Sequence, residues 1–176
     1  MLHLNFTPFP ILTTKRLQLR QLTTADANEI LIHRSDERIL EFIDIPKAST
    51  LEDALAFIHK INKGIAENES IFWGIQLKER PLLIGSICLW NISKEENSGE
   101  IGYMLHPDSQ GKGIMQEALE KVIEFGFINL KLKTVVADVH PNNLKSIQLL
   151  KKNGFVYKAT IKDMVVYELN DPSLSH

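Results

Sequence analysis

A short glycine turn between a strand and a helix is the feature of this 176-residue chain that most constrains its fold. The turn is Gln110-Gly111-Lys112-Gly113-Ile114-Met115. Residues 99–105 before it have the pattern of a strand, and from Met115 onward apolar side chains recur at helical spacing. Glycine lets a backbone approach a ligand closely, and the unpaired N–H groups of a helix start favour an anion. The turn therefore predicts a site for a phosphate or pyrophosphate.

The other elements alternate in type along the chain. The patterns predict strands over residues 16–22, 71–78, 82–92, 99–106, 134–139, 155–161 and 164–169. They predict helices after residue 24, after a capping box at Ser49-Thr50-Leu51-Glu52, over residues 112–128, and from Asn142 or Asn143 to Asn153. This order favours an α+β, or mixed α/β layered, domain in which helices cover a central sheet. Without repeats or a linker, residues 1–176 are expected to form a single domain.

Composition narrows the class of protein. A net charge of -2 gives no basic excess, so nucleic acid is not an expected partner. No apolar run approaches the ~20 residues needed to cross a bilayer, and no membrane association is expected. The single Cys88 fits a reducing compartment, which with the absent leader predicts a cytoplasmic protein. The six histidines show no ligand-like grouping, so no metal is expected.

Further motifs around the turn carry a family resemblance. The pattern Gln-x-x-Gly-x-(Gly/Ala) after a Glu-bearing strand resembles the acetyl-CoA signature of the GCN5-related N-acetyltransferase (GNAT) family. The opening Leu12-Thr13-Thr14-Lys15-Arg16-Leu17-Gln18-Leu19-Arg20 resembles the RimJ/RimL branch, which acetylates protein N-termini, notably of ribosomal proteins. The resemblance runs from about residue 11 to 170 and includes His106-Pro107, Gln116-Glu117-Ala118, Asn143-x-x-Ser146 and Lys152-Asn153-Gly154-Phe155. Met115 departs from it, because the family usually has Gly or Ala there.

The resemblance implies a fold, a donor and an acceptor. It implies a GNAT-like, mostly antiparallel sheet with helices on both faces and a splayed pair of fourth and fifth strands that receives pantetheine. Acetyl-CoA would be the donor and a primary amine the acceptor, the leading one being a ribosomal or other protein N-terminus, in a monomer or homodimer. The implied CoA-binding residues are Met104, Leu105, Gln110, Gly111, Lys112, Gly113, Ile114, Met115 and Asn143.

Two residues are candidate catalytic groups. Strand alternation puts Glu100 on one face with Gly102 and Met104, where small neighbours leave room for substrate or water. The resemblance implies that Glu100 takes the amine's proton, and the alternative is an exposed acid at a strand start. Asn143 and Ser146 lie one helical turn apart. The resemblance places Ser146 near the leaving sulfur, whereas the tyrosine acid of many members is replaced here by Leu150.

Several alternatives stay open. His106 and His140 each precede a proline, and either could be the base, although simple His-Pro turns are favoured. Cys88 lies in an apolar run, so a structural role is favoured over an acyl-enzyme. An acidic N-terminal helical region would attract a small amine or polyamine as the acceptor. A non-catalytic CoA-binding sensor is a further hypothesis, in which Glu100 would have no role.

Overall fold

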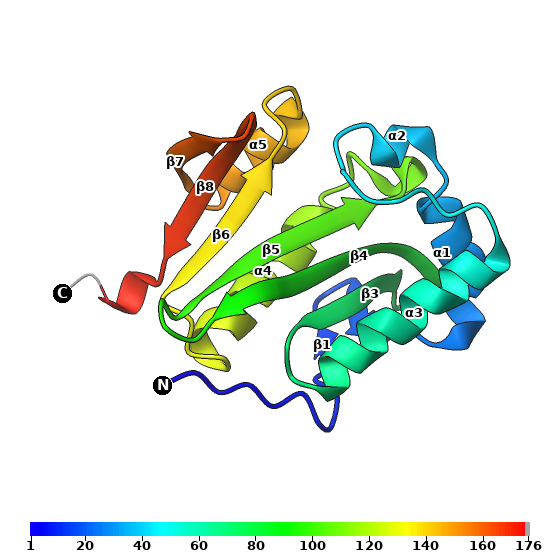
Figure 1. The fold of residues 1–176 in the computed structure, drawn as a ribbon, viewed down its shortest axis with the longest axis horizontal. Helices are drawn as coiled ribbons and strands as arrows, with labels where there is room; N and C mark the ends of the chain where they lie inside the picture. The colour runs from blue at the N-terminus through cyan, green and yellow to red at the C-terminus, as the bar shows by residue number, and fades with distance from the viewer. Residues whose placement is uncertain (175–176) are drawn as a thin grey trace.

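The computed structural model describes residues 1–174, which form one open sheet with helices on both faces (Figure 1). The elements follow in the order β1 (Leu12–Thr13), β2 (Leu17–Arg20), α1 (Ala27–His33), α2 (Glu37–Leu40), α3 (Leu51–Ala66), β3 (Ile71–Leu77), β4 (Arg80–Ser93), β5 (Ser98–Leu105), α4 (Ile114–Ile128), β6 (Thr134–Val139), α5 (Leu144–Lys152), β7 (Val156–Ile161) and β8 (Met164–Asn170). Short 3₁₀ turns span Thr24–Asp26, Pro107–Ser109 and Pro172–Leu174. The mixed α/β prediction is confirmed.

The sheet is mostly antiparallel, as expected. Its eight strands lie in the order β1-β2-β3-β4-β5-β6-β8-β7, and the parallel pair is β5 with β6. These two strands pair only where residues 98–100 lie beside residues 134–136. Beyond that point they diverge, which confirms the predicted splay (Figure 1). The splayed strands are the fourth and fifth long strands and carry the labels β5 and β6, because the two-residue β1 precedes the first predicted strand.

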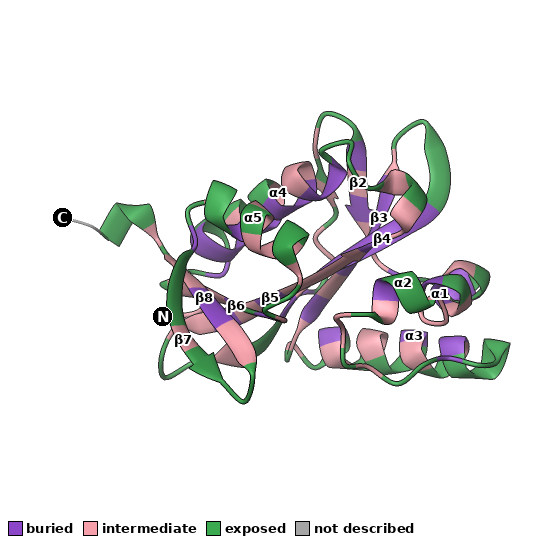
Figure 2. Ribbon diagram, turned by 90° about the horizontal axis from the view of Figure 1, so that it is seen from above, coloured by how far each residue is buried: buried purple, intermediate pink, exposed green. Residues whose placement is uncertain are grey.

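Helices cover the sheet in two layers. α4 and α5 lie on one face, and α1, α2 and α3 lie on the other (Figure 2). The α4 side holds the larger core, in which Ala118, Leu119 and Val122 are fully buried against the sheet. A smaller cluster fills the space between the sheet and the helices of the other face, and it consists of Leu22, Ala27, Ile30, Ala54, Ile58 and Leu83. Burial of apolar area on both faces of the sheet is the main force that holds the layers together.

The start of α3 corrects one detail of the sequence prediction. The helix is capped one residue later than expected, by Thr50, whose hydroxyl accepts the Asp53 N–H at 3.2 Å. The Asp53 carboxylate returns the bond by accepting the Thr50 N–H. The predicted pair of Ser49 and Glu52 is wrong because the Asp53 carboxylate accepts the backbone N–H groups of both Ser49 and Thr50, which places the N-cap at Thr50. In the observed register Ala54 and Ile58 face the core.

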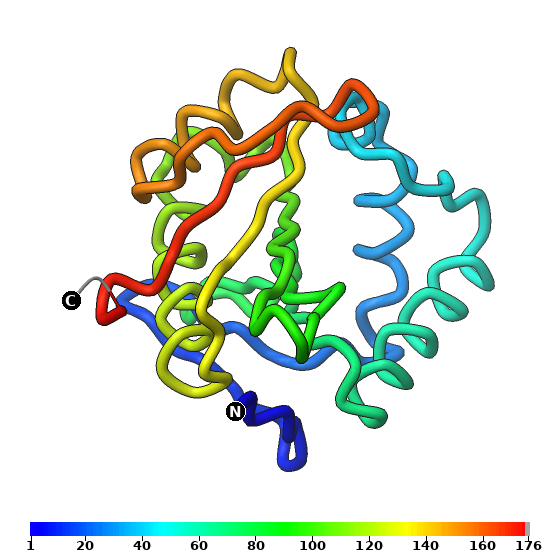
Figure 3. Tube along the Cα trace, turned by 60° about the vertical axis from the view of Figure 1, so that its left-hand side comes forward, coloured from blue at the N-terminus to red at the C-terminus, as the bar shows by residue number. Residues whose placement is uncertain are grey.

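The segment after α2 crosses the fold to meet the end of β6. Figure 3 shows it beside the carboxyl end of that strand, and the rings of Phe42 and His140 lie 5.3 Å apart there. The two helical layers therefore approach each other at the open end of the splay. This is the place where a ligand could touch both faces of the sheet.

Candidate functional site

The predicted strand–turn–helix is present. α4 begins at Ile114, and its N-cap is Gly113, so within the described residues no side chain caps the first turn. Gly111 and Gly113 both have φ of +73°, in the left-handed region that favours glycine. A Cβ on Gly111 would meet nothing within 4 Å, so the outer side of the turn is open. The Gln110 side chain holds the turn to β5 by donating to the Leu105 carbonyl at 3.0 Å. The open turn and the free helix start fit a phosphate group.

The opening of the chain locks this turn in place. Arg16 donates to the Lys112 carbonyl at 2.9 Å and to the Glu117 carboxylate at 2.7 Å. Glu117 also accepts the Arg16 backbone N–H and the Thr14 hydroxyl. Burial acts to raise the pKa of Glu117, but these hydrogen bonds and the guanidinium charge hold it below its usual range. Sequence reasoning missed this contact, which joins positions about a hundred residues apart.

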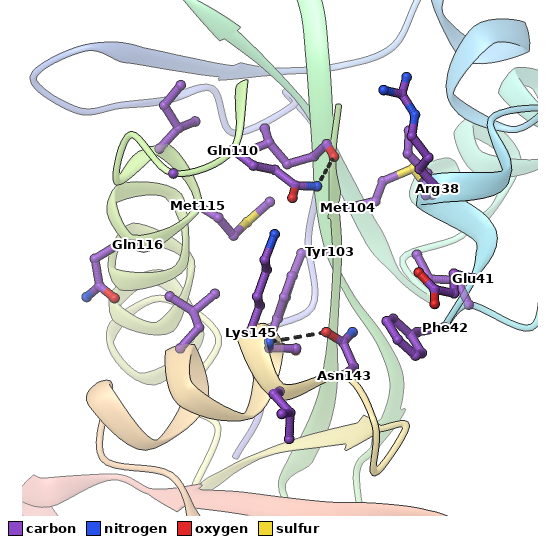
Figure 4. A pocket seen from close by; sticks show the side chains of 18 of the residues that line it. Arg38, Glu41, Phe42, Tyr103, Met104, Gln110, Met115, Gln116, Asn143 and Lys145 are labelled. Atoms are coloured by element: carbon purple, nitrogen blue, oxygen red, sulfur yellow. Dashed lines mark hydrogen bonds between the residues drawn. The ribbon is translucent and has the colours of Figure 1, made fainter. Parts of the chain in front are cut away.

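A cavity of about 600 Å³ opens beside the turn. It is lined by α4 and α5 on one side and by α2 with the segment after it on the other (Figure 4). It brings together most of the predicted CoA-binding residues, namely Met104, Leu105, Gln110, Gly111, Gly113, Ile114, Met115 and Asn143, together with Ser146. Met115 is only 8 % exposed, so the side chain that departs from the family pattern packs mainly into the core. The cavity therefore begins at the glycine turn and runs along the splay.

The lysines near the turn divide into two kinds. Lys112 does not line the cavity, because its ammonium donates to the Asp108 carbonyl at 2.9 Å. Only its backbone belongs to the turn. Lys145 and Lys152 of α5 do line the cavity, and Lys145 lies at its centre in Figure 4. Their positive charge makes the α5 side of the cavity suitable for a polyanionic ligand.

The start of α5 brings a serine and a tyrosine together at the cavity wall. Asn143 caps the helix, accepting the Ser146 N–H at 3.3 Å, as predicted for one of the two asparagines. The Ser146 hydroxyl lies 2.6 Å from the hydroxyl of Tyr103 on β5. Burial raises the pKa of Tyr103 to about 12, so the phenol is protonated at neutral pH. Tyr103 was part of the strand motif, but only the structure shows its contact with α5.

Glu100 lies apart from the cavity, on the other face of β5. Ile101 and Leu105 pack into the α4-side core, so alternation turns Glu100 toward the opposite face, next to Trp90. It is half-buried and accepts a hydrogen bond from Asn91 at 3.4 Å. Burial, and then the nearby charge of Asp138, raise its pKa. Glu100 thus stands where the splay begins, and a molecule reaching it would come from the face opposite α4.

The other candidate bases and nucleophiles have structural roles here. Both histidines form the favoured His-Pro turns: Nδ1 of His106 accepts the Asp108 N–H, and Nδ1 of His140 accepts the Asn142 N–H. Cys88 lies within β4, and burial raises the pKa of its thiol to about 12. A thiol that stays protonated is a poor nucleophile.

Part of the acidic helical region is engaged in local structure. Asp36 pairs with Arg38 at 2.6 Å and caps α2, and Asp53 completes the capping box of Thr50 at the start of α3. Glu41 lines the cavity beside Phe42, on the wall that faces α5 (Figure 4). Sequence reasoning did not predict this wall, because the segment around α2 has no clear periodicity.

Within residues 1–174, no three His, Cys, Asp or Glu side chains gather as metal ligands would. Over the same residues, no helix is both long and apolar enough to cross a bilayer.

Known proteins resemble this chain in sequence and in fold. The family model described as an acetyltransferase (GNAT) domain matches residues 16–156. YoaA, an N-acetyltransferase of Bacillus subtilis strain 168, is 32% identical over 154 residues, which cover 88% of this chain and 87% of that protein.

Solved structures share the fold at lower sequence identity. RimL, the ribosomal L7/L12 alpha-N-protein acetyltransferase in complex with coenzyme A, has a TM-score of 0.82 at 15% identity, covering 92% of this chain and 98% of its own. The microcin C7 self-immunity acetyltransferase MccE, in complex with acetyl-CoA and AMP, has a TM-score of 0.78 at 21% identity, covering 90% and 94%. The matched residues 16–156 and the likeness to YoaA show that the chain belongs to the GNAT family of acetyl-CoA-dependent N-acetyltransferases.

Proposed function

We propose that this N-acetyltransferase moves the acetyl group of acetyl-CoA to the α-amine of a protein or peptide N-terminus, by direct attack in a ternary complex. The observation that carries the proposal is the splay between β5 and β6. It joins an anion-binding cavity on the α4 side to a carboxylate, Glu100, on the other side. A donor and an acceptor could therefore approach the same gap from opposite faces.

The residues of the cavity suit the parts of CoA. The free amides of the turn at residues 111–116 would hold the pyrophosphate, and Lys145 and Lys152 would neutralise phosphate charge. The Asn143 side chain at the start of α5 would meet the pantetheine arm. When bound, CoA supplies an activated acetyl thioester at the splay, and the protein's own groups orient the two reactants.

Glu100 would serve as the base for the incoming amine. A protein α-amine has a pKa of about 7.7–8.0, so much of it is charged at neutral pH and must lose a proton before it attacks. The raised pKa of Glu100 makes its carboxylate a better proton acceptor than an exposed glutamate. Asn91 would keep the carboxylate oriented through its hydrogen bond. Ser146 would face the sulfur end of the donor from the other side of the gap.

A small amine or polyamine is the second candidate acceptor. The observation that favours it is Glu41, an exposed carboxylate on the cavity wall that could pair with a cationic amine. The structural neighbour RimL is named for a ribosomal protein, which favours the protein N-terminus. Both acceptors are therefore compared in one test.

The test is acetyl-CoA turnover against two panels, one of N-terminal peptides that include ribosomal sequences and one of polyamines and small amines. Mass spectrometry would locate the acetyl group on each product. We expect the peptide panel to give the higher kcat/KM, with the label on the α-amine. Faster turnover of polyamines would favour the second acceptor. Tight CoA binding without turnover of either panel would instead support the sensor hypothesis.

The kinetic order tests the direct transfer. A ternary complex predicts intersecting initial-rate lines, and a Cys88→Ser variant that keeps its turnover. Parallel lines, or a folded Cys88→Ser variant that binds both substrates but transfers nothing, would indicate an acyl-enzyme instead. A cytoplasmic site of action fits a protein whose one cysteine is a reduced thiol inside the sheet.

A further inference from the structure

The Tyr103–Ser146 pair has a geometry that a simple wall of the cavity does not need. The two hydroxyl oxygens lie 2.6 Å apart, although the residues come from β5 and α5 and are 43 positions apart in the chain. Both side chains line the cavity. Within residues 1–174, the Tyr103 phenol has no other hydrogen-bond partner, and neither has the Ser146 hydroxyl.

The direction of this hydrogen bond follows from the chemistry of the two groups. A phenol is a stronger acid than an aliphatic alcohol, so the Tyr103 O–H is the better donor and the Ser146 oxygen the better acceptor. Burial keeps the phenol protonated, which maintains the donor at neutral pH. The Ser146 O–H is then not used in this hydrogen bond and can donate to another group. The Asn143 cap holds the serine backbone at the cavity wall, and because Ser146 lines the cavity its free O–H can donate to a group bound there.

We propose that Tyr103 is a positioning residue for acetyl transfer, whose hydroxyl orients the Ser146 O–H toward the sulfur that leaves the acetyl group. This inference rests on the proposed function. As the new C–N bond forms, the C–S bond breaks and its electron pair stays on sulfur. The Ser146 O–H stabilises that thiolate by donating a hydrogen bond, without giving up its proton. The amine's proton leaves on the opposite side of the gap, to Glu100.

Next to the pair, the described part of α5 and the two cavity methionines offer the sulfur no second hydroxyl. Leu150, one turn after Ser146 on α5, is fully buried and has no hydroxyl to donate. Lys145 on the cavity side of α5 suits phosphate charge, and Met104 and Met115 present thioethers, which lack a proton. A hydrogen bond from a fixed hydroxyl needs no reorganisation when charge develops on the sulfur. Tyr103 therefore contributes by fixing a donor rather than by touching the reacting atoms.

The test measures the pKa of the CoA thiol bound to the protein, through the ultraviolet absorbance of its thiolate. The same protein with desulfo-CoA, which lacks the thiol, gives the blank. Cys88 does not interfere below about pH 10, because burial raises its pKa to about 12. We expect Ser146→Ala to raise the pKa of bound CoA by about one unit, since it removes the hydrogen bond that favours the thiolate. Tyr103→Phe should raise this pKa by at most the same amount, since it leaves the Ser146 donor in place but no longer fixes its direction. The double variant should raise it no further than Ser146→Ala alone.

Turnover gives an independent readout. Tyr103→Phe should lower kcat by about 10-fold, the worth of one ordinary hydrogen bond lost from the transition state, with KM for acetyl-CoA nearly unchanged. Ser146→Thr, which keeps a hydroxyl, should retain most of the activity. Tyr157→Phe is the matched control, because it removes the hydroxyl of another tyrosine–hydroxyl pair, Tyr157 with Thr160 on the β7 edge, far from the cavity.

The outcomes separate this inference from the proposed function. An unchanged thiol pKa in Tyr103→Phe overturns the inference while leaving acetyl transfer by the wild-type protein intact. The same holds if Tyr103→Phe and Ser146→Ala have fully additive effects on kcat, since two independent contacts would then be acting. If Tyr103→Phe fails to fold, Ser146→Ala and Ser146→Thr apply the test from the other side of the hydrogen bond. A wild-type protein that binds no CoA refutes the proposed function itself.

Discussion

At the scale of single residues, the environment of Glu100 links stability to catalysis. Burial and the charge of Asp138 raise its pKa, so the ionised carboxylate is less favourable in the folded chain than in the unfolded one. Its contribution to stability is complete below the unfolded pKa and is lost as the pH rises through the folded pKa. A residue kept ionised at such a cost is typical of a functional site.

Replacing this carboxylate should therefore raise the stability of the fold and lower the rate of acetyl transfer. At neutral pH, Glu100→Gln should melt at or above the wild-type temperature, and the difference should vanish toward pH 4. Its kcat should fall on the order of 10²–10⁴, the usual worth of a general base, and recover in part at high pH. Melting curves and pH–rate profiles measure the two effects. A folded Glu100→Gln variant with near wild-type kcat across pH 6–9 would exclude Glu100 as the base and leave His140 or a water chain.

At the scale of elements, the glycine turn before α4 is where sequence and structure agree best. A φ of +73° at Gly113 and the uncapped helix start are local properties, and a local pattern can predict them. The contacts of Arg16 with Glu117 and of Tyr103 with Ser146 are decided by tertiary packing, and no spacing in the chain encodes them. The α2 wall of the cavity was missed for the same reason. The pattern thus predicted the turn itself, whereas the tertiary contacts that hold the turn in place could not be predicted from it.

Charge at the turn can be tested separately from strain. Gly113→Asp and Gly113→Asn have similar size, and both residues tolerate left-handed backbone. A carboxylate beside the pyrophosphate should weaken CoA binding at least about 10-fold more than the amide does, because like charges close together are costly. Arg16 would sit near the new side chain and offset part of this, since its Nη2 lies 3.5 Å from the added Cβ position. Equal calorimetric affinities for the two variants would place the phosphates elsewhere.

The contact between the chain opening and α4 makes a prediction of its own. Glu117→Gln should lose about 1–2 kcal/mol of stability at neutral pH, a value reduced for solvent screening because the Arg16 side chain is 42% exposed. The pKa of Glu117 is held low, so this stability is present above its unfolded pKa and is lost as the pH falls through the folded pKa. CoA affinity should drop with it. Glu124→Gln, which breaks the exposed pair with Lys121, is the matched control for denaturant melts and calorimetry. Equal losses in both variants would contradict a special role for Glu117.

At the scale of the whole molecule, the splay separates the proposed binding site of the acetyl donor, on one face of the sheet, from the proposed base for the acceptor, on the other. The α4 face carries the glycine turn proposed to bind phosphate and the Tyr103–Ser146 pair, and the opposite face carries Glu100, the proposed base. Sequence alternation predicted the side of β5 on which Glu100 lies. It could not predict how the α2 segment closes the open end, because that depends on the contact of Phe42 with His140. Access to the gap therefore depends on how the two helical layers are held together at this end.

One buried histidine, which contacts the end of β5 from α1, should make the stability of the fold depend on pH. His33, in the last turn of α1, is 3% exposed, and its ring lies 5.7 Å from that of His106 after β5. Burial first, and then the charge of His106, lower its pKa to about 4, while Asp36 acts in the other direction. The folded chain therefore holds His33 neutral. Its contribution to stability is present above the unfolded pKa of about 6.5 and is lost as the pH falls toward about 4.

The free energy of unfolding of the wild-type protein should thus fall steeply between pH 6.5 and about 4. Over this range the unfolded chain binds up to one more proton at His33 than the folded chain does. His33→Gln removes the titrating group, so its denaturation midpoint should fall less over the same range, even if it starts lower at pH 7.5. His59→Gln, an exposed histidine on α3, should follow the wild-type curve. Denaturant melts at several pH values between 7.5 and 4 measure all three slopes. Parallel curves for wild type and His33→Gln would show that other groups, such as Asp26 beside Arg20, set the acid limit of the fold.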